Sequence, residues 1–338
     1  MPYQTLNRRD FFSRSALAVT STSTSLLMPL QALAQNALPA KPARIVVGFT
    51  PGGSADLIAR TLALQLNSAA ASVIVENKPG AGGRIALEAL RNAEADGSTM
   101  LITPSSMLTL YPHVYKKLNY DPLKDFAPVA EIASFSFVLV IGPLVPAPIK
   151  TLAEFLAWCK ANPKLAAYAS SGNGSPPHFA GVALARATQT ELTHVAYKGG
   201  APAMNDVIGG QIAANIAVVS NALPHLQSGK LRALAVTGNT RSNALPQVPT
   251  IQELGFANVN VSEWFGIFLP SKTPADIVAK LNSSVQIALK SKALQEVLVK
   301  ASFDPATVTT PAGTTKLLRA ETEYWASLVK ASGFTPED

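Results

Sequence analysis

The sequence predicts an α/β protein of two doubly wound lobes, between which the chain crosses twice. Short β-branched runs alternate with longer helical patterns along the 338 residues, which is typical of a parallel sheet covered by helices on both faces. The alternation begins again after a proline-rich passage at 143–148. A chain of this length also exceeds what one hydrophobic core usually serves, which favours two domains.

The first set of alternating elements precedes that passage. Its β-branched and apolar runs predict strands at 44–49, 72–76, 99–103 and 135–142, and its helical patterns lie at 54–68 and 84–91. Thr151, with Glu154 three residues on, has the spacing of a capping box and predicts the start of a helix that runs to Lys160.

The second set closes before a polar loop at 239–249. Strands are expected at 166–169, 192–195, 213–219 and 233–237, and helices at 176–188, 201–208 and 222–228. An apolar segment at 264–269 and helices at 275–290, 294–300 and 314–331 follow the loop. We therefore expect one lobe to comprise 41–140 with 240–338, and the other to comprise 141–239.

Residues 1–34 have the composition of an export signal. Arg8 and Arg9 precede two phenylalanines and a long uncharged run rich in small residues. Ala32 and Ala34 match the small-residue pattern of a signal-peptidase site, so cleavage is expected after Ala34. The arginine pair favours the twin-arginine route, and the general secretory route, which also needs a basic start, stays open. The mature protein is then expected in the periplasm.

Composition argues against several classes of protein. The net charge of +7 is spread along the chain without a Lys/Arg block, unlike the basic faces of nucleic-acid binders. The four histidines lack metal-ligand spacing, and no Gly-x-Ser-x-Gly nucleophile elbow occurs. The single cysteine, Cys159, is predicted to lie buried on a helix, where its side chain fills space in the core. We expect no metal, no cofactor and no catalytic residue.

Four predicted strand–helix junctions carry glycines, prolines and small polar side chains. They lie two per lobe, at 50–56, 103–106, 170–178 and 197–202. Ligands of open α/β sheets bind at such junctions, and helix N-termini hold anions through backbone N–H groups without needing an arginine. Each junction alone is compatible with an ordinary turn, but four together favour a shared cleft for a small anion, such as a carboxylate.

Neither glycine cluster matches a phosphate-binding motif. The cluster at 51–54 lacks the Lys-Ser/Thr ending of a Walker loop, and the cluster at 80–83 departs from Gly-x-Gly-x-x-Gly. Charged residues near the junctions have a structural interpretation as well. Asp56, four residues before Arg60 in a first helical turn, favours pairing on the helix surface, and Asp206 is also expected to be structural.

Motifs along the chain carry a family resemblance. They are VGFTPGGSAD (47–56), VENKPGAGG (75–83), DGSTML (96–101), Gly174-Ser175 with His178, HVAYKGGAPA (194–203), VPTI (248–251) and WFG (264–266). Together they resemble the Bug family, the extracytoplasmic receptors of tripartite tricarboxylate transporters, over essentially the whole mature chain. Ser98 stands where an aromatic residue is common in that family.

The resemblance implies a type II periplasmic-binding-protein fold whose lobes close around a carboxylate held by backbone groups and water. It further implies a monomer whose partners are the carboxylate and either membrane subunits of a tripartite tricarboxylate transporter or a sensor, with no nucleic acid. Carried over to this sequence, the contacts would come from Thr50, Pro51, Gly52, Gly53, Thr103 and Ser105 of one lobe, and Gly174, Ser175, His178, Tyr197, Lys198, Ser220 and Asn221 of the other.

One enzymatic alternative stays open at this point, a secreted hydrolase using Ser175 and His178. It would need a third group to orient the histidine and an oxyanion site, and the spacing nominates neither. His178 itself is equally compatible with orienting the Ser175 loop and with capping its helix.

Overall fold

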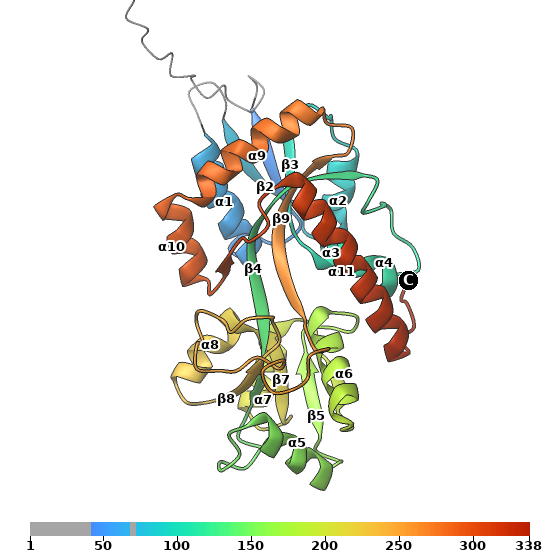
Figure 1. Ribbon diagram of the computed structural model, residues 1–338, viewed down its shortest axis with the longest axis vertical. Helices are drawn as coiled ribbons and strands as arrows, with labels where there is room; N and C mark the ends of the chain where they lie inside the picture. Colours follow the sequence, from blue (N-terminus) through green and yellow to red (C-terminus); the bar gives the residue numbers. More distant parts are fainter. Residues whose placement is uncertain (1–41, 68–71) are drawn as a thin grey trace, which may run out of the picture. The chain divides into compact units, whose positions relative to one another are not determined.

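Strand β4 (Phe126–Ile141) joins two groups of strands. The computed structural model describes residues 42–67 and 72–338, so the predicted export signal lies outside the described residues. The strand order is β2-β1-β3-β9-β4-β7-β5-β6, and β8 and β10 also pair with β4 (Figure 1). Up to Ser136, β4 pairs with β9, and from Phe137 onward it pairs with β7 and β8.

The first group of strands is parallel except where β9, β4 and β10 join it. Its strands are β1 (Ala43–Val47), β2 (Val73–Asn77), β3 (Thr99–Pro104), β9 (Ser262–Pro270) and β10 (Asp304–Pro305). Alternate residues of β1 face opposite cores. Ile45 packs in the core that includes α1, whereas Val46 packs in the core that includes α2, so both faces of the sheet are covered.

The second group has the same two-faced construction. It contains β5 (Ala167–Ser170), β6 (Thr193–Ala196), β7 (Ala214–Val218) and β8 (Arg232–Val236). On β7, Ile216 packs with residues of α5 and α6, whereas Ala217 packs with residues of α7 and α8. The β5–β6 and β5–β7 pairs are parallel, and both neighbours of β4 here are antiparallel to it.

The helices alternate with these strands as expected. They are α1 (Ser54–Leu66), α2 (Arg84–Arg91), α3 (Ser106–Thr109), α4 (Tyr111–Val114), α5 (Leu152–Ala161), α6 (Pro176–Thr188), α7 (Gly200–Ile208), α8 (Val219–Gln227), α9 (Ala275–Leu289), α10 (Lys292–Lys300) and α11 (Pro311–Ser332), with a short 3-10 turn η1 (Ala81–Gly83). No helix in the described part of the chain is long and apolar enough to cross a membrane.

Three chain segments meet where β4 changes partner. The Phe137 N–H donates to Thr237 Oγ1 at 3.1 Å, and the Val261 N–H donates to Thr237 O at 3.0 Å. β4 changes partner at 136–137. Residues 245–251 pack beside β8, and pairing with β4 resumes with β9 at Ser262. The crossings near 143–148 and 239–249 stay predictions. The lobe bounds themselves stay a prediction, since the described residues form one compact unit.

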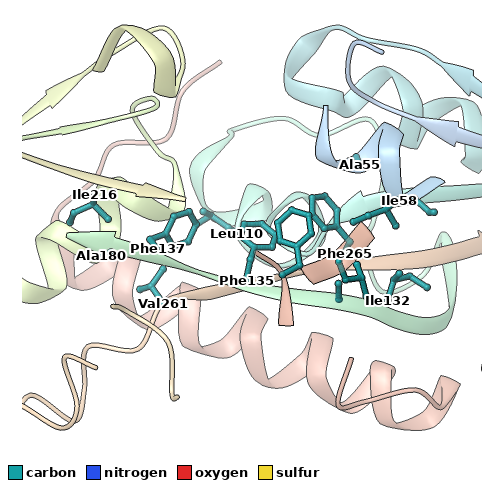
Figure 2. Close-up of a cluster of buried hydrophobic side chains, with 14 of the residues drawn as sticks. Ala55, Ile58, Leu110, Ile132, Phe135, Phe137, Ala180, Ile216, Val261 and Phe265 are labelled. Atoms are coloured by element: carbon teal, nitrogen blue, oxygen red, sulfur yellow. The ribbon is translucent and has the colours of Figure 1, made fainter. Parts of the chain in front are cut away.

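Aromatic side chains fill the core around this crossing. Phe135 stacks on Phe265 with ring centroids 5.1 Å apart and meets Phe137 edge-on at 5.9 Å. Figure 2 shows these rings between Ile216 of the second group and Ile58 of the first. The hydrophobic core is therefore continuous from one group of strands to the other. Cys159 is buried on α5, as the sequence predicts.

Candidate functional site

The predicted binding loops lie at the carboxyl ends of the strands in both groups. β1, β5 and β6 lead through short loops to α1, α6 and α7, and β7 leads directly into α8. The predicted contact residues differ in exposure. Thr50, Pro51, Gly52, Gly53, Lys198 and Asn221 are exposed, Ser175, Tyr197 and Ser220 are half-buried, and Thr103, Ser105, Gly174 and His178 are buried.

Asp56 organises the first loop. Its Oδ2 accepts hydrogen bonds from the Gly52 N–H and from Arg60 Nε, both at 2.9 Å. Its Oδ1 accepts from Asn77 Nδ2 at 2.8 Å, and the same nitrogen donates to Phe49 O at 3.0 Å. Burial opposes ionisation, but these hydrogen bonds outweigh it and lower the pKa of Asp56. A buried, fully bonded carboxylate thus fixes the loop instead of facing a ligand.

Hydrogen bonds within the protein hold the loop after β3. Thr103 Oγ1 donates to Met107 Sδ at 2.9 Å, and the Ser105 N–H donates to Trp264 O at 2.8 Å. Both side chains are 1% exposed. The Thr103 hydroxyl is therefore occupied within the protein, and ligand contact by Thr103 or Ser105 stays a prediction.

Two buried carboxyl groups lie next to this loop. Trp264 Nε1 donates to Glu321 Oε1 at 2.8 Å, and Ser106 hydrogen bonds reach Glu263. Burial raises the pKa of Glu263 to about 7 and the pKa of Glu321 to about 8, partly offset by these hydrogen bonds. Both groups are substantially protonated near neutral pH, so little negative charge is present there to repel an anion.

The loops of the second group are bonded to one another. The Tyr197 N–H donates to Ser170 O at 3.1 Å, and the Gly199 N–H donates to Ser171 O at 3.0 Å. A Cβ atom added to Gly200 would lie 3.5 Å from Asn221 Nδ2, so the start of α8 adjoins the start of α7. The structure therefore brings the predicted loops at 170–178 and 197–202 together with the start of α8.

Tyr197 and its neighbours divide into bonded and exposed groups. The Tyr197 hydroxyl donates to Asp206 Oδ2 at 2.7 Å, and burial together with Asp206 raises the pKa of Tyr197 to about 12. Asp206 is thus a structural partner, as the sequence predicts. The Tyr197 hydroxyl serves the protein, whereas its half-buried ring and the exposed Lys198 can face a ligand.

His178 stacks on His194, with ring centroids 3.8 Å apart. His178 Nδ1 accepts from the Gly174 N–H at 3.1 Å. His194 Nε2 lies 2.7 Å from Ser170 Oγ, whose hydroxyl donates to Gly172 O at 2.9 Å, so His194 is the donor to Ser170. Burial lowers the pKa of both rings to about 4, and His178 adds to the effect on His194. Both rings are neutral at physiological pH and orient the loop between them.

Acid should loosen this loop. In the unfolded chain a histidine titrates near pH 6.5, so the unfolded state binds more protons and stability falls as the pH drops from about 6.5 towards 4. We expect about 1–2 kcal/mol lost per histidine between pH 6.5 and 5 in urea titrations of unfolding. His178→Phe keeps a stacked ring and should weaken this dependence. A stability that is flat from pH 6.5 to 5 would contradict the assignment.

The helices at the binding loops begin without side-chain caps. No side chain caps α1, α6, α7 or α8. Thr151, Ser291 and Thr310 cap α5, α10 and α11, which start away from the binding loops, and α2, α3, α4 and α9 are uncapped as well. Uncapped first turns leave backbone N–H groups and the positive end of the helix dipole available to an anion.

No three His, Cys, Asp or Glu side chains among residues 42–67 and 72–338 are arranged to hold a metal. The chemistry that the loops offer is therefore that of backbone N–H groups, hydroxyls and a few exposed polar side chains.

Two α/β halves joined by crossing strands, with uncapped helices at the strand ends, define a type II periplasmic-binding-protein fold. A solved periplasmic binding protein, BugD, is 30% identical, with a TM-score of 0.73 over 88% of this chain and 100% of that one. Residues 58–334 match the family described as tripartite tricarboxylate transporter family receptor. The chain belongs to this family, and the Bug resemblance is confirmed.

Other relatives agree over nearly the full length. BugT from Bordetella pertussis is 36% identical over 297 residues, covering 87% of this chain and 90% of BugT. The structure of R. palustris Rpa4515 with adipate is 30% identical, with a TM-score of 0.76 over 88% of this chain and 99% of that one.

Sequence reasoning missed two of the residues that hold the loops. Asn77 ties the loop after β1 to Asp56, and His194 stacks on His178. Both lie inside quoted family motifs, and both occupy strands parallel to the loop-bearing strand, so the strand pairing is the signal that would have placed them.

Proposed function

We propose that this protein is a periplasmic receptor that captures a small organic carboxylate between its lobes without converting it. The observation that carries the proposal is the set of uncapped helices α1, α6, α7 and α8 at strand ends of both strand groups. The first turns of α1, α7 and α8 offer N–H groups to a carboxylate, whereas α6 begins with Pro176 and Pro177, which have none, and contributes the His178 N–H and its helix dipole. Because both lobes contribute, the ligand favours the conformation in which they close around it.

The ligand class follows from the site chemistry and from a relative. Backbone donors, hydroxyls and an exposed lysine suit carboxylate oxygens, and the Asp56 carboxylate is neutralised by its own partners. Rpa4515 was solved with adipate, a dicarboxylate, which supports an organic acid here. We propose one carboxylate group per lobe for a diacid.

The residues proposed to contact it are those the family motifs indicate. They are Thr50, Pro51, Gly52, Gly53, Thr103 and Ser105 from the lobe of 41–140 and 240–338, and Gly174, Ser175, His178, Tyr197, Lys198, Ser220 and Asn221 from the lobe of 141–239. Given their burial, we propose that Thr103, Ser105 and His178 act by shaping the loops, and that the exposed residues touch the ligand.

The contacts of Ser175 and His178 favour binding over hydrolysis. Ser175 Oγ donates to Gly172 O at 2.7 Å, and His178 Nδ1 accepts from the Gly174 N–H. Both groups are thus directed at their own loop and not at each other, whereas a nucleophile needs its base within hydrogen-bond reach. Turnover of a bound acid by the purified protein would reverse this choice.

Export and partners complete the proposal. Residues 1–34 would direct the chain to the periplasm and be cleaved after Ala34, by the twin-arginine route. The mature monomer would then deliver its ligand to membrane subunits of a tripartite tricarboxylate transporter. The mass of the exported protein tests the cleavage site. The amount of mature protein that reaches the periplasm in a strain lacking the twin-arginine translocase tests the route.

A thermal-shift screen tests the ligand class. Mature protein, freed of co-purified ligand, is combined with mono-, di- and tricarboxylates and with matching amides that carry no charge. At 100 times its dissociation constant a ligand should add about 2.7 kcal/mol to the free energy of unfolding. We expect a carboxylate to do so and its amide to have no effect. A flat response to every acid would contradict the proposal.

Gly53→Val tests whether α1 holds the ligand. Gly53 is exposed with φ −77°, and an added Cβ would lie 3.6 Å from Thr50 O, so the fold should accept the change. The bulk would block the helix start, and we expect the dissociation constant to rise about 10-fold or more. Ala153→Val, at the start of the capped helix α5, is the matched control. Unchanged binding by Gly53→Val would remove α1 from the site.

A further inference from the structure

The segment after α11 pairs with the first strand group. The Glu337 N–H donates to Val114 O and the Lys116 N–H donates to Glu337 O, both at 2.8 Å, so that Glu337 and Tyr115 form a parallel bridge. Lys116 Nζ also lies 3.1 Å from Asp338 Oδ1. Figure 1 places this end of the chain beside α4. Residues 334–338 are thus attached through Glu337 to the stretch that follows α4.

The same segment touches the loop between β5 and α6 in the second group. Asn173 Nδ2 donates to Glu337 Oε1 at 2.6 Å. The Phe334 ring meets His178 edge-on at 5.8 Å and Phe179 at 5.4 Å. One helical turn earlier, the Arg186 guanidinium donates to Ala331 O. Polar and aromatic contacts therefore join the segment to the start of α6, and the end of α11 to the last turn of α6.

The surroundings of Gly174 show how closely the loop packs against its neighbours. Its φ of +67° already favours glycine, and an added Cβ would lie 3.2 Å from Phe334 Cζ and 3.5 Å from the Val114 side chain. Gly174 therefore lies against Phe334 of the segment and Val114 of α4. Its N–H is meanwhile fixed by His178 Nδ1.

We propose that residues 334–338 form a strap that positions the 172–175 loop against Val114 for ligand binding. The inference rests on the proposed function, because Gly174 and Ser175 are proposed contacts there. A loop held in its bound geometry loses less conformational entropy when the ligand arrives. The strap also favours the arrangement of the lobes in which Gly174 lies on Val114, and so slows ligand release.

The test removes the strap and measures the loop directly. A chain ending at Gly333 lacks Phe334 and Glu337, and Asn173→Ala removes only the polar contact. Asp338→Asn is the control, because it breaks the exposed pair with Lys116 and leaves the loop contacts in place. Amide hydrogen exchange is followed by mass spectrometry without ligand. The dissociation constant is measured by calorimetry for the carboxylate that stabilises the protein most in the thermal-shift screen.

The strap predicts a local effect. In the shortened chain, exchange should quicken about 10-fold in peptides covering 172–178 and 114–116 but not in α9 or α5. The dissociation constant should rise about 10-fold, mainly through faster release, with a smaller rise for Asn173→Ala and none for Asp338→Asn. Exchange that quickens throughout the protein would indicate a purely structural role and overturn the proposal.

Two results separate this inference from the proposed function. If no acid binds the intact protein, the proposed function fails, while the exchange measurement still decides whether the strap holds the loop. If the shortened chain does not fold, Phe334→Ala and Asn173→Ala carry the test. Wild-type exchange and affinity in both of these variants would overturn the strap.

Discussion

Replacement of Arg232 by methionine should lower the free energy of unfolding by about 3 kcal/mol. Its guanidinium donates to five carbonyls of the passage after β4, at 2.6–3.2 Å: Gly142, Val145, Pro146, Ala147 and Ile149. Methionine fills similar volume but removes these donors. Gly142 O and Pro146 O still accept from the Val145 and Ile149 N–H groups, whereas the oxygens of Val145, Ala147 and Ile149 lose their guanidinium donor. Water can reach those nearest the surface, which keeps the loss below the sum of five charged hydrogen bonds.

Urea unfolding at neutral pH measures this loss. Arg232→Lys should be intermediate, because an ammonium keeps the charge but lacks the planar fork that reaches several carbonyls. Arg241→Met is the matched control. Arg241 pairs with Glu253 at the surface, where both side chains are more than 40% exposed, and such a pair is worth about 0–1 kcal/mol. Equal losses for Arg232→Met and Arg241→Met would refute the role assigned to Arg232.

Asp56→Ala should weaken ligand binding about 10-fold and destabilise the protein by about 2–3 kcal/mol. The substitution removes the acceptor of three hydrogen bonds. Gly52 is then no longer linked to Asn77 through Asp56, although the bond from Asn77 Nδ2 to Phe49 O remains. Asp56→Asn keeps the shape but turns an amide N–H₂ towards donors, so we expect a similar loss of stability. Calorimetry with the bound acid and urea unfolding give the two quantities.

The pH dependence of this effect has a definite sign. Because the folded-state pKa of Asp56 is lowered, its contribution is present above the unfolded pKa of about 4 and is lost as the pH falls further. Wild type and Asp56→Ala should therefore converge in stability below pH 4. Asp276→Ala removes another first-turn aspartate paired with a residue four positions on, Lys280, but at an exposed site. It should change little, and a loss equal to that of Asp56→Ala would contradict the argument.

Local signals predicted much of the fold. The capping box at Thr151 forms as expected, with the Glu154 N–H donating to Thr151 Oγ1 at 3.2 Å, and α5 follows it. Helix α1 begins at Ser54, the residue the pattern indicates. These features depend on residues within one or two turns of each other, which a sequence displays directly.

The errors concern partners that are distant in sequence. The strand predicted at 135–142 omits the first half of β4, which contains Pro128 and the charged Glu131. In the structure Glu131 Oε2 accepts from the Val308 N–H at 2.7 Å, a residue that no local pattern connects with it. The alternation of strands and helices also does not reveal that β4 and β9 run antiparallel to each other.

The candidate site shows the same division. Glycine-rich junctions after strands are visible in the sequence, and the structure brings those of 170–178 and 197–202 together. The stack of His178 on His194 and the bond from Asn77 to Asp56 depend on which strands are neighbours. His194, for example, is positioned by its pairing with Tyr168 between β5 and β6. A single sequence does not contain that register.

The partner change within β4 has a consequence for how the chain folds. β4 and β9 border the entire second group in sequence, so their pairing closes a very long loop, and long-range closure is slow. The second group contains its own pairings and can form on β4 first, which shortens the distance that β9 must search. Refolding should therefore show early protection of amides in β5 and β7 and late protection in β9, with the binding-competent protein appearing only in the late phase.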